Sequence, residues 1–310
     1  MSYADIERRL NKGDIVILDG GTGTELERRG VQMNADAWCG PATLENVSML
    51  EAIHRDYISA GADIITANTF ASSRLMLTKA GLADQFVEIN KTAVEAAHRA
   101  RDASGRDDIL VAGSLSHMAP VQSGTARSDP QQASTQSELA DTFGELADLL
   151  CAQGCDLILL EMMYDPKRMY SAFTAAMATG LPVWAGFSAR SNKDGSTLSF
   201  KQDIDIPFED IIKILGEFDV AAAGIMHTPS NIIGDALTKL REVYSGPLTA
   251  YPDSGYFKMP EWQFENVIAP DDFANFAQEW VDNGAQIIGG CCGLSPDHIA
   301  ALKSLTKRSK

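Results

Sequence analysis

Short runs rich in β-branched residues alternate with longer segments of helical spacing along nearly the whole chain, and this alternation limits the possible folds more than any other feature. Strand and helix alternating eight times predicts an α/β fold of the (β/α)8 TIM barrel type rather than an open doubly wound sheet. Barrels of this kind use about 200 to 300 residues as one domain. We therefore expect residues 1–310 to form a single domain.

The candidate strands share a core of Val, Ile and Leu and are bounded by Gly, Asp or Pro. They are Ile15 to Leu18, Asp63 to Ala67, Ile109 to Gly113, Asp156 to Leu160, Pro182 to Phe187, Val220 to Ile225, Pro247 to Ala250, and Gln286 to Ile288. The candidate helices are Leu44 to Ala60, Asp84 to Ala103, Gln136 to Gln153, Pro166 to Thr179, Pro207 to Glu217, Ser230 to Tyr244, and Pro270 to Asn283.

A long stretch without either pattern covers about residues 116–137, after the third candidate strand. It is rich in Gly, Ser, Thr and Gln and contains two prolines. A segment longer than about 15 residues is typical either of a functional loop or lid, or of a disordered insertion. Both interpretations stay open at this point.

The charge balance limits the partners. Asp and Glu number 42 against 26 Lys and Arg, a formal net charge of −16, which disfavours nucleic acid and anionic membranes as partners. The sequence contains neither a run of about 18 apolar residues nor a secretory signal pattern at its start. Five cysteines, an odd number with two adjacent, argue against a disulfide framework and predict a reducing, cytoplasmic location. Cys39, Cys151 and Cys155 are interpreted as ordinary buried or half-buried thiols.

The stretch Gly289-Gly290-Cys291-Cys292-Gly293 follows the last candidate strand. Adjacent cysteines do not readily bridge each other, because a vicinal disulfide strains the peptide between them. Glycines on both sides allow the backbone to turn sharply, so that both thiolates can reach one ion. A soft-metal site is therefore one interpretation, and a pair of small buried thiols is the other.

Other unusual residues also follow candidate strands, at the barrel end where chemistry is expected. They are Asp19 to Gly23 after the first strand, Asn68 to Phe70 after the second, Glu161 after the fourth, His227 to Pro229 after the sixth, and Tyr251 to Gly255 after the seventh. Ordinary loop polarity explains Asn68 and Asp253. It does not explain a carboxylate, an imidazole and two thiols at one barrel end.

Together these motifs resemble the homocysteine S-methyltransferase family. The resemblance rests on Asp19 to Leu26, Ala60 to Phe70, Glu161, Tyr251 to Gly255 and Gly289 to Gly293, in order, over about Ile15 to Ala301. It implies an enzyme that moves a methyl group from a small onium donor to a zinc-bound thiolate, forming methionine from homocysteine. It also implies three cysteine ligands for the zinc, two of which are Cys291 and Cys292.

The third family cysteine ends a Gly-x-Asn-Cys stretch, and here the matching stretch is Gly224-Ile225-Met226-His227. Histidine thus stands where the family has cysteine. Either His227 replaces the ligand, since imidazole binds zinc well, or the metal is lost and His227 is a base or hydrogen-bonding residue. With two thiolates and a neutral imidazole, the retained zinc site is less negative, which favours a reactive sulfonium donor over a quaternary ammonium.

The resemblance also implies substrate contacts. Asp19 and Glu161 would bind the amino group of the thiol substrate, although Asp19 is also explained as a turn-capping residue. The carboxylate of the substrate would bind the backbone of Gly20 and Gly21 or the strand end at Thr66, Asn68 and Thr69. An onium donor needs an aromatic cage, and the candidates are Trp38, Phe70, Tyr164, Tyr251, Tyr256 and Trp262.

Two further positions bear on this assignment. Met162 follows Glu161 where the betaine-dependent branch has a tyrosine, which disfavours betaine as the donor. His117 opens the long loop and could reach the site. The alternative functions are a barrel subunit of a corrinoid- or pterin-dependent methyl-transfer system and a non-catalytic zinc- or thiol-binding barrel. A homo-oligomer is possible.

Overall fold

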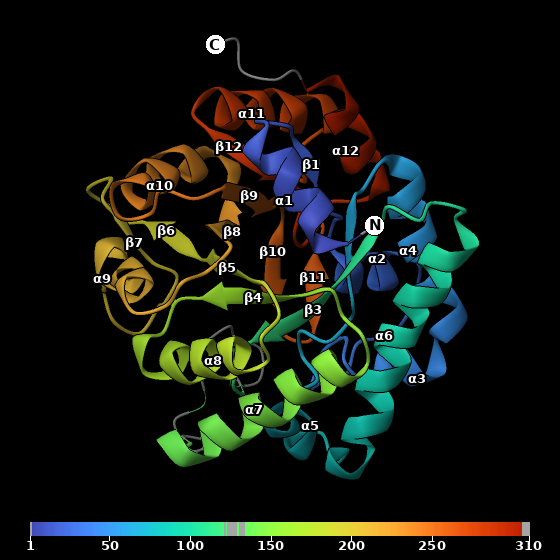
Figure 1. Ribbon diagram of the computed structural model, residues 1–310. Helices are drawn as coiled ribbons and strands as arrows, with labels where there is room; N and C mark the ends of the chain where they lie inside the picture. The colour runs from blue at the N-terminus through green and yellow to red at the C-terminus, as the bar shows by residue number, and fades with distance from the viewer. Residues whose placement is uncertain (1, 121, 123–128, 130–133, 306–310) are drawn as a thin grey trace.

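The computed structural model describes residues 2–120, 122, 129 and 134–305, and its centre is a parallel sheet with helices around it (Figure 1). The strands follow the order β1-β12-β9-β8-β5-β4-β3-β2. An isolated parallel bridge between Leu18 and Ile64 joins β1 to β2 and brings the two sheet edges together. The (β/α)8 barrel predicted from the alternation is thereby confirmed.

All eight barrel strands lie where the sequence predicts them, within a few residues. Their bounds are β1 Val16–Ile17, β2 Ile64–Thr66, β3 Leu110–Ser116, β4 Leu157–Met163, β5 Val183–Phe187, β8 Ala222–Pro229, β9 Leu248–Asp253 and β12 Ala285–Ile288. The long strands β4, β8 and β9 extend past their predicted ends. Each of these extensions carries a residue considered above as polar or reactive: Glu161, His227 and Asp253.

The outer helices correspond to the predicted helical segments and bury an apolar face against the sheet. They are α4 Val47–Ala60, α6 Phe86–Ala103, α7 Gln136–Ala152, α8 Pro166–Ala178, α9 Phe208–Ile212, α10 Ser230–Val243 and α11 Pro270–Asp282. The shorter helices α2 Thr22–Arg28, α5 Arg74–Lys79 and α12 Pro296–Ala301 were not predicted, and α3 Ala42–Glu45 overlaps only the start of the predicted segment Leu44 to Ala60.

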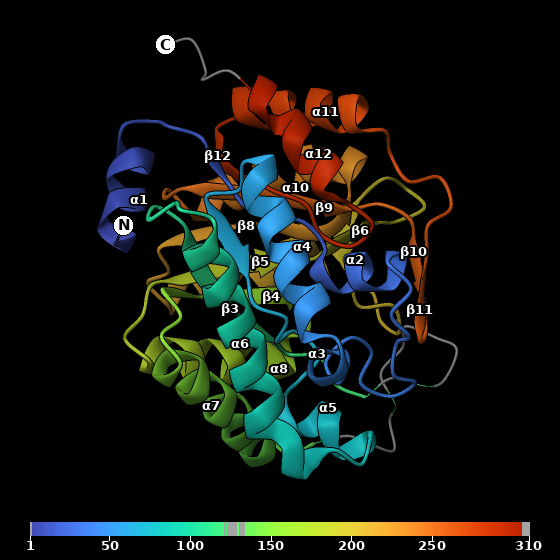
Figure 2. The ribbon, with the colours of Figure 1, turned by 90° about the vertical axis from the view of Figure 1, so that its right-hand side faces the viewer.

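The amino-terminal helix α1, Tyr3–Asn11, lies against the end of the barrel where the strands begin (Figure 2). Its buried residues Ile6 and Leu10 belong to the same apolar cluster as the side chains inside the barrel. Trp184 of β5 donates from Nε1 to the hydroxyl of Tyr3 at 2.9 Å. The helix therefore closes this end of the barrel with apolar contacts.

Two antiparallel hairpins lie at the opposite end. One is β6 Ala189–Ser191 with β7 Thr197–Ser199, and the other is β10 Tyr256–Lys258 with β11 Glu261–Gln263. Figure 2 shows β10 and β11 on the far side of the barrel from α1. We call this carboxyl-terminal end of the strands the mouth. Neither hairpin was predicted, because each strand is only three residues long.

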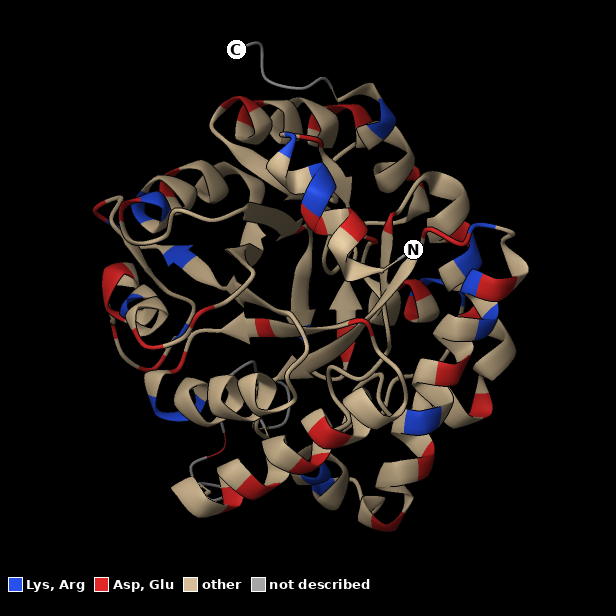
Figure 3. Ribbon diagram, viewed as in Figure 1, with Lys and Arg blue, Asp and Glu red and all other residues tan. Residues whose placement is uncertain are grey.

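Acidic and basic residues are interspersed on the outer helices, so the excess of acidic side chains is spread rather than gathered (Figure 3). Within the described residues, no helix is both long and apolar enough to cross a bilayer. Half of the predicted loop at about 116–137 lies outside the described residues, namely positions 121, 123–128 and 130–133. Its role stays a prediction.

Candidate active site

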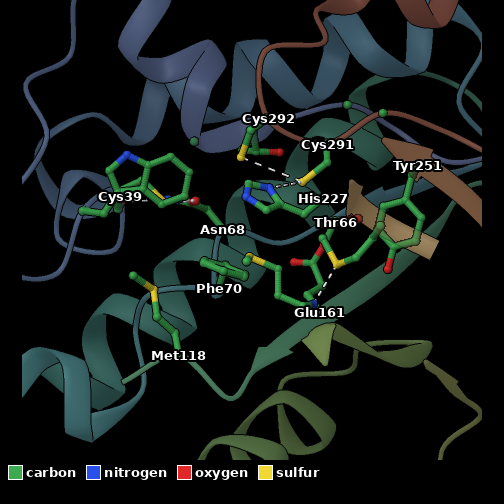
Figure 4. Close-up of a pocket in the computed structure, with 18 of the residues that line it drawn as sticks. Cys39, Thr66, Asn68, Phe70, Met118, Glu161, His227, Tyr251, Cys291 and Cys292 are labelled. Atoms are coloured by element: carbon green, nitrogen blue, oxygen red, sulfur yellow. Dashed lines mark hydrogen bonds between the residues drawn. The ribbon is translucent and has the colours of Figure 1, made fainter. Parts of the chain in front are cut away.

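The adjacent cysteines follow β12 in a loop that the end of β9 holds on both sides. Cys291 donates its backbone N–H to the carbonyl of Pro252 at 2.7 Å, and Ser254 donates its N–H to the carbonyl of Cys292 at 2.9 Å. Gly293 has φ of 82°, and a β-carbon there would lie 1.9 Å from the carbonyl oxygen of Ser254. Only glycine fits this turn. As a result the two sulfurs face the same side, 3.8 Å apart, as free thiols (Figure 4).

His227 brings a third donor to the two sulfurs. It adopts a left-handed backbone conformation, φ 43°, within the last residues of β8, and its Nδ1 lies 3.6 Å from Cys291 Sγ. The donor atoms of His227, Cys291 and Cys292 all lie within 4.8 Å of one another. Figure 4 shows the three side chains pointing toward one another.

These distances match a tetrahedral metal site. With Zn–S bonds of about 2.3 Å and Zn–N bonds of about 2.0 Å, ligand sulfurs lie about 3.8 Å apart, and sulfur and nitrogen about 3.5 Å apart. The observed separations are 3.8 Å between the two sulfurs and 3.6 Å between Cys291 Sγ and His227 Nδ1, and Cys292 Sγ lies within 4.8 Å of the imidazole donor. The residues present therefore fit zinc with three protein ligands, and the fourth tetrahedral position is left for a substrate atom.

The second ring nitrogen of His227 faces Asp253. Nε2 lies 3.7 Å from Oδ2 of Asp253, and both side chains are about nine-tenths buried. Burial lowers the pKa of His227, but Asp253 and Cys291 together raise it to about 9. Burial raises the pKa of Asp253, and its Oδ1 has no hydrogen-bond partner among the described residues. Ordinary loop polarity, expected for Asp253 from the sequence, does not account for this buried contact with His227.

Glu161 and Asp19 line the cavity that opens beside the sulfurs. Glu161 accepts a hydrogen bond from Ser114 at Oε2, and burial raises its pKa to about 7. Met162 beside it has φ of 54°, and the pairing of β4 with β5 shifts register there. Such a bulge redirects neighbouring side chains.

Asp19 is held by β2 rather than by its own turn. Its Oδ2 accepts from the backbone N–H of Thr66 at 2.6 Å, and its Oδ1 accepts from the Thr66 hydroxyl at 2.9 Å. Burial raises the pKa of Asp19 to about 7, against the lowering effect of these two hydrogen bonds. The turn-capping interpretation of Asp19 is therefore wrong, because both oxygens bond to Thr66 on the neighbouring strand β2.

Aromatic rings follow one another around the cavity wall in edge-to-face or stacked contacts, with centroids 4.6 to 6.4 Å apart. In order they are Phe70, Trp38, Phe257, Trp262, His227, Phe200, Tyr164 and His117. We call this set the aromatic belt. Phe257 and Phe200 were missed, because they belong to hairpin regions that the sequence pattern did not predict.

The remaining predicted residues are divided. Gly20, Gly21, Asn68 and Tyr251 line the same cavity, whereas Thr69 does not. The Thr69 hydroxyl is fully buried and donates to the carbonyl of Ser114 at 2.7 Å. Tyr256, a predicted cage residue, is half exposed and lies outside the cavity wall.

His117 does reach the cavity, but its Nε2 is occupied. It accepts from the backbone N–H groups of Tyr164 and Asp165 at 3.0 and 3.1 Å. Burial keeps the pKa of His117 well below its usual value. His117 is thus a neutral wall residue that anchors the segment after β4.

Comparisons with known proteins agree with one another. Residues 16–306 match the model of a family described as homocysteine S-methyltransferase. Homocysteine S-methyltransferase 2 of Arabidopsis thaliana is 30% identical over 325 residues, covering 96% of this chain and 94% of the relative. The selenocysteine methyltransferase of Astragalus bisulcatus is 28% identical over 317 residues, covering 94% and 92%.

A solved structure is similar as well. The metallated form of the homocysteine methyltransferase MmuM from Escherichia coli superposes with a TM-score of 0.76 at 26% identity. The match covers 95% of this chain and 97% of that one. The similarity therefore extends over the whole barrel rather than a shared fragment.

Proposed function

The chain belongs to the homocysteine S-methyltransferase family, and from this premise we propose that it transfers a methyl group from a small sulfonium donor to the zinc-bound thiolate of homocysteine. The observation that carries the proposal is the three-donor cluster of His227, Cys291 and Cys292 in the wall of a cavity. The same cavity holds two carboxylates suited to an ammonium group and aromatic faces suited to an onium group.

Zinc is the metal we propose for this cluster. Thiolate and imidazole ligands in tetrahedral arrangement suit zinc, and a solved relative is described in metallated form. Bound there, zinc would supply Lewis-acid chemistry that ionises a substrate thiol near neutral pH. The chain's own contribution is to hold two sulfurs and one nitrogen within 4.8 Å of one another, with Cys291 Sγ at near-tetrahedral separations from the other two donors.

The acceptor would be oriented by its amino group. Oε2 of Glu161 accepts the hydrogen bond from Ser114, and Oε1 has no hydrogen-bond partner among the described residues. Both oxygens of Asp19 already bond to Thr66. We therefore assign the direct ammonium contact to Glu161 and a supporting electrostatic role to Asp19. The backbone around Gly20 and Gly21 lines the same cavity and would receive the substrate carboxylate.

The donor would lie against the aromatic belt. A cation is attracted to aromatic faces within about 6 Å, and Trp is the strongest of these. No Lys or Arg is among the described residues that line the cavity, whereas two carboxylates are. This composition favours a cationic donor over an anionic one. A sulfonium compound satisfies it, and its neutral thioether product is held less strongly and leaves.

Several expectations stay predictions. These are the cytoplasmic location, the absence of a nucleic-acid or membrane partner, and a homo-oligomeric state. A subunit of a corrinoid- or pterin-dependent system and a non-catalytic thiol-binding barrel are the competing functions. Relatives named as methyltransferases match this chain over more than nine-tenths of their own length, which supports an enzyme.

A donor panel tests the proposal. Zinc-loaded protein is incubated with homocysteine and each of several methylated sulfonium and ammonium compounds, and methionine is measured by mass spectrometry. We expect methionine with a sulfonium donor, loss of it in Cys291→Ser, and no change in the control Cys151→Ser, whose thiol lies on α7. Methionine formed only after a corrinoid protein is added would contradict the proposal. So would zinc binding without transfer from any donor.

A further inference from the structure

Histidine at a position where three thiolates are expected changes two properties of the site. A cysteine thiolate binds the metal through its only polar atom. An imidazole has another nitrogen besides the one that binds the metal, and when buried this nitrogen needs a hydrogen-bond partner. The tautomer of the ring decides which nitrogen can bind the metal. The imidazole also brings no negative charge. The group that faces the second ring nitrogen can provide both the hydrogen-bond acceptor and the negative charge. In this chain that group is Asp253.

We propose that Asp253 is the positioning residue of the metal site. Its carboxylate accepts the Nε2–H of His227, so that the Nδ1 lone pair faces the two sulfurs. The same carboxylate also supplies the negative charge that a third cysteine would have carried, but it lies behind the imidazole rather than on the metal. This inference rests on the proposed zinc site and deepens it.

The geometry of the pair supports this role. Nδ1 of His227 lies 3.6 Å from Cys291 Sγ while Nε2 lies 3.7 Å from Asp253 Oδ2, so the ring spans the sulfurs and the carboxylate. The second distance is longer than a hydrogen bond of about 2.9 Å, and a small side-chain movement closes it. Oδ1 of Asp253 is buried without a partner among the described residues, so no hydrogen bond at that oxygen opposes the movement.

The backbone around Asp253 is fixed to both cysteines. Its neighbours Pro252 and Ser254 form the hydrogen bonds to Cys291 N–H and to the Cys292 carbonyl described above. Ser254 is fixed in turn, because its hydroxyl accepts from the N–H of Ile268 at 2.8 Å. The Asp253 carboxylate therefore belongs to the segment that positions the two thiols, so the loop that carries the cysteines and this aspartate are held together by the same hydrogen bonds.

The ring of His227 is also held from its sides. Phe200 packs against it at a centroid distance of 5.3 Å and Trp262 at 5.7 Å, both nearly edge-on. These contacts limit rotation of the imidazole but do not choose its tautomer, because aromatic carbons neither donate nor accept a strong hydrogen bond. The choice of tautomer is left to Asp253.

The charge balance follows directly. Two thiolates and a neutral imidazole leave the formal charge of a zinc centre at zero, one unit less negative than three thiolates. When the Asp253 carboxylate is counted with the zinc and its ligands, the total formal charge is −1, as it is with three thiolates. The expectation of a less negative site, drawn from histidine alone, therefore changes. The histidine and aspartate together approximate one thiolate, and the bound substrate sulfur keeps more of its nucleophilic character.

A double-mutant cycle on the full-length chain tests the proposal. The four proteins are wild type, Asp253→Asn, His227→Cys and His227→Cys/Asp253→Asn. Zinc affinity is measured by competition with a chromophoric chelator. The Co²⁺-substituted absorption spectrum reports how many thiolates bind. Outer-shell partners of metal-bound histidine are typically worth about 10- to 100-fold in metal affinity.

We expect Asp253→Asn to weaken zinc binding by about 10- to 100-fold when residue 227 is histidine. In the His227→Cys background the same substitution should leave affinity unchanged or increase it, because a thiolate has no N–H to donate and is repelled by the carboxylate. The two-thiolate Co²⁺ spectrum should persist in Asp253→Asn, with thermal unfolding of the metal-free proteins showing that each variant folds.

Equal losses in both backgrounds would mean that Asp253 only supports the fold, and would overturn the proposal. So would an unchanged affinity in Asp253→Asn alone. Neither outcome touches the proposed function, because zinc would still bind the wild type. A wild-type chain that binds no zinc would instead overturn the metal site itself, and the positioning role with it.

Discussion

Two buried aspartates, at opposite ends of the same barrel, are partnered in different ways. Asp63, before β2, accepts from the backbone N–H of Ile17 and from the guanidinium of Arg9, each at 2.9 Å. Asp253, at the end of β9, faces His227 at 3.7 Å and leaves Oδ1 without a partner among the described residues. The first carboxylate is satisfied by the protein alone, and the second is not.

The same contrast extends to the surroundings of each aspartate. The closed end is filled by α1, whose apolar side chains pack into the barrel interior. At the mouth, Trp38, Met162 and His227 all have positive φ, and of the non-glycine residues in the described part of the chain only Asn266 shares that feature. Such conformations cost about 1 to 3 kcal/mol each. The barrel interior at the closed end is therefore filled by apolar contacts, whereas backbone strain gathers at the mouth.

The largest effect on stability should come from the closed end. Ile6→Ala empties a fully buried position of α1 and should lower the free energy of unfolding by about 2 to 5 kcal/mol, because the barrel end cannot collapse to fill the space. Zinc affinity should not change. The control Glu7→Ala lies on the exposed face of the same helix and should stay within about 0.5 kcal/mol. Chemical denaturation measures the free energy of unfolding of both variants. A change in zinc affinity in Ile6→Ala would contradict the claim that the closed end acts on stability alone.

The next effect concerns the mouth. His227→Ala removes one ligand, and it should weaken zinc binding by about 100- to 1,000-fold, or about 2.5 to 4 kcal/mol, a quarter of a typical structural-zinc affinity. The metal-free protein should unfold near the wild-type temperature. His98→Ala, on α6, is the matched control and should bind zinc normally. Chelator competition and calorimetry provide the two readouts.

A smaller effect is expected at the acceptor carboxylate. Glu161→Gln should weaken binding of methionine, a thioether analogue of the acceptor, by about 1.5 to 3 kcal/mol through loss of a charge-assisted hydrogen bond. Binding of N-acetylmethionine, which lacks the ammonium group, should not respond. Isothermal titration measures both. An equal loss for the two ligands would remove Glu161 from ammonium recognition.

The pH dependence of the same step has a defined sign. The pKa of Glu161 is raised to about 7, so the carboxyl is protonated below that pH and ionised above it. Methionine affinity should therefore rise as pH increases from 6 to 8, and Glu161→Gln should reduce the rise to the smaller part that Asp19, whose pKa is also raised to about 7, contributes. In the metal-free protein the contribution of Glu161 to stability falls as pH rises from its usual pKa of 4.5 to about 7, because the folded state holds the proton more tightly.

The smallest effect should be at the donor side. Trp38→Leu removes a ring of the aromatic belt and should weaken binding of a sulfonium donor by about 0.5 to 2 kcal/mol. Tyr256→Leu changes an exposed aromatic residue outside the cavity and serves as the control. Competition between a sulfonium compound and its neutral thioether measures the effect. A Trp38 variant that weakens both ligands equally would indicate packing rather than attraction to the charge.

The sequence predicted the repeating part of this protein well. Strands with a Val and Ile core and helices of three or more turns carry their period in the sequence, so all eight strands were found. Glu161, His227 and the cysteines were found because strand ends of a barrel converge. Helix α1 was missed, since its apolar residues Ile6 and Leu10 are few and gain meaning only from the barrel end that they cover.

The role of Asp253 could not be predicted, for a physical reason. An aspartate in a Pro-Asp-Ser-Gly stretch also suits an ordinary turn, and nothing local separates the two roles. Its partner is 26 residues earlier, on the neighbouring strand β8, and the loop from β12 fixes their relative position. The histidine at position 227, where the family resemblance implies a cysteine, was the available signal, because a buried imidazole requires a partner for its second nitrogen.

The central claim is that His227, Cys291 and Cys292 together hold one zinc ion, and X-ray absorption at the zinc edge on the purified, metal-replete protein tests it most directly. The account predicts about one zinc per chain with two sulfur ligands at about 2.3 Å and one imidazole nitrogen at about 2.0 Å. Addition of homocysteine should raise the sulfur count by one. A chain without zinc, or a His227→Ala protein with an unchanged zinc spectrum and full occupancy, would contradict it.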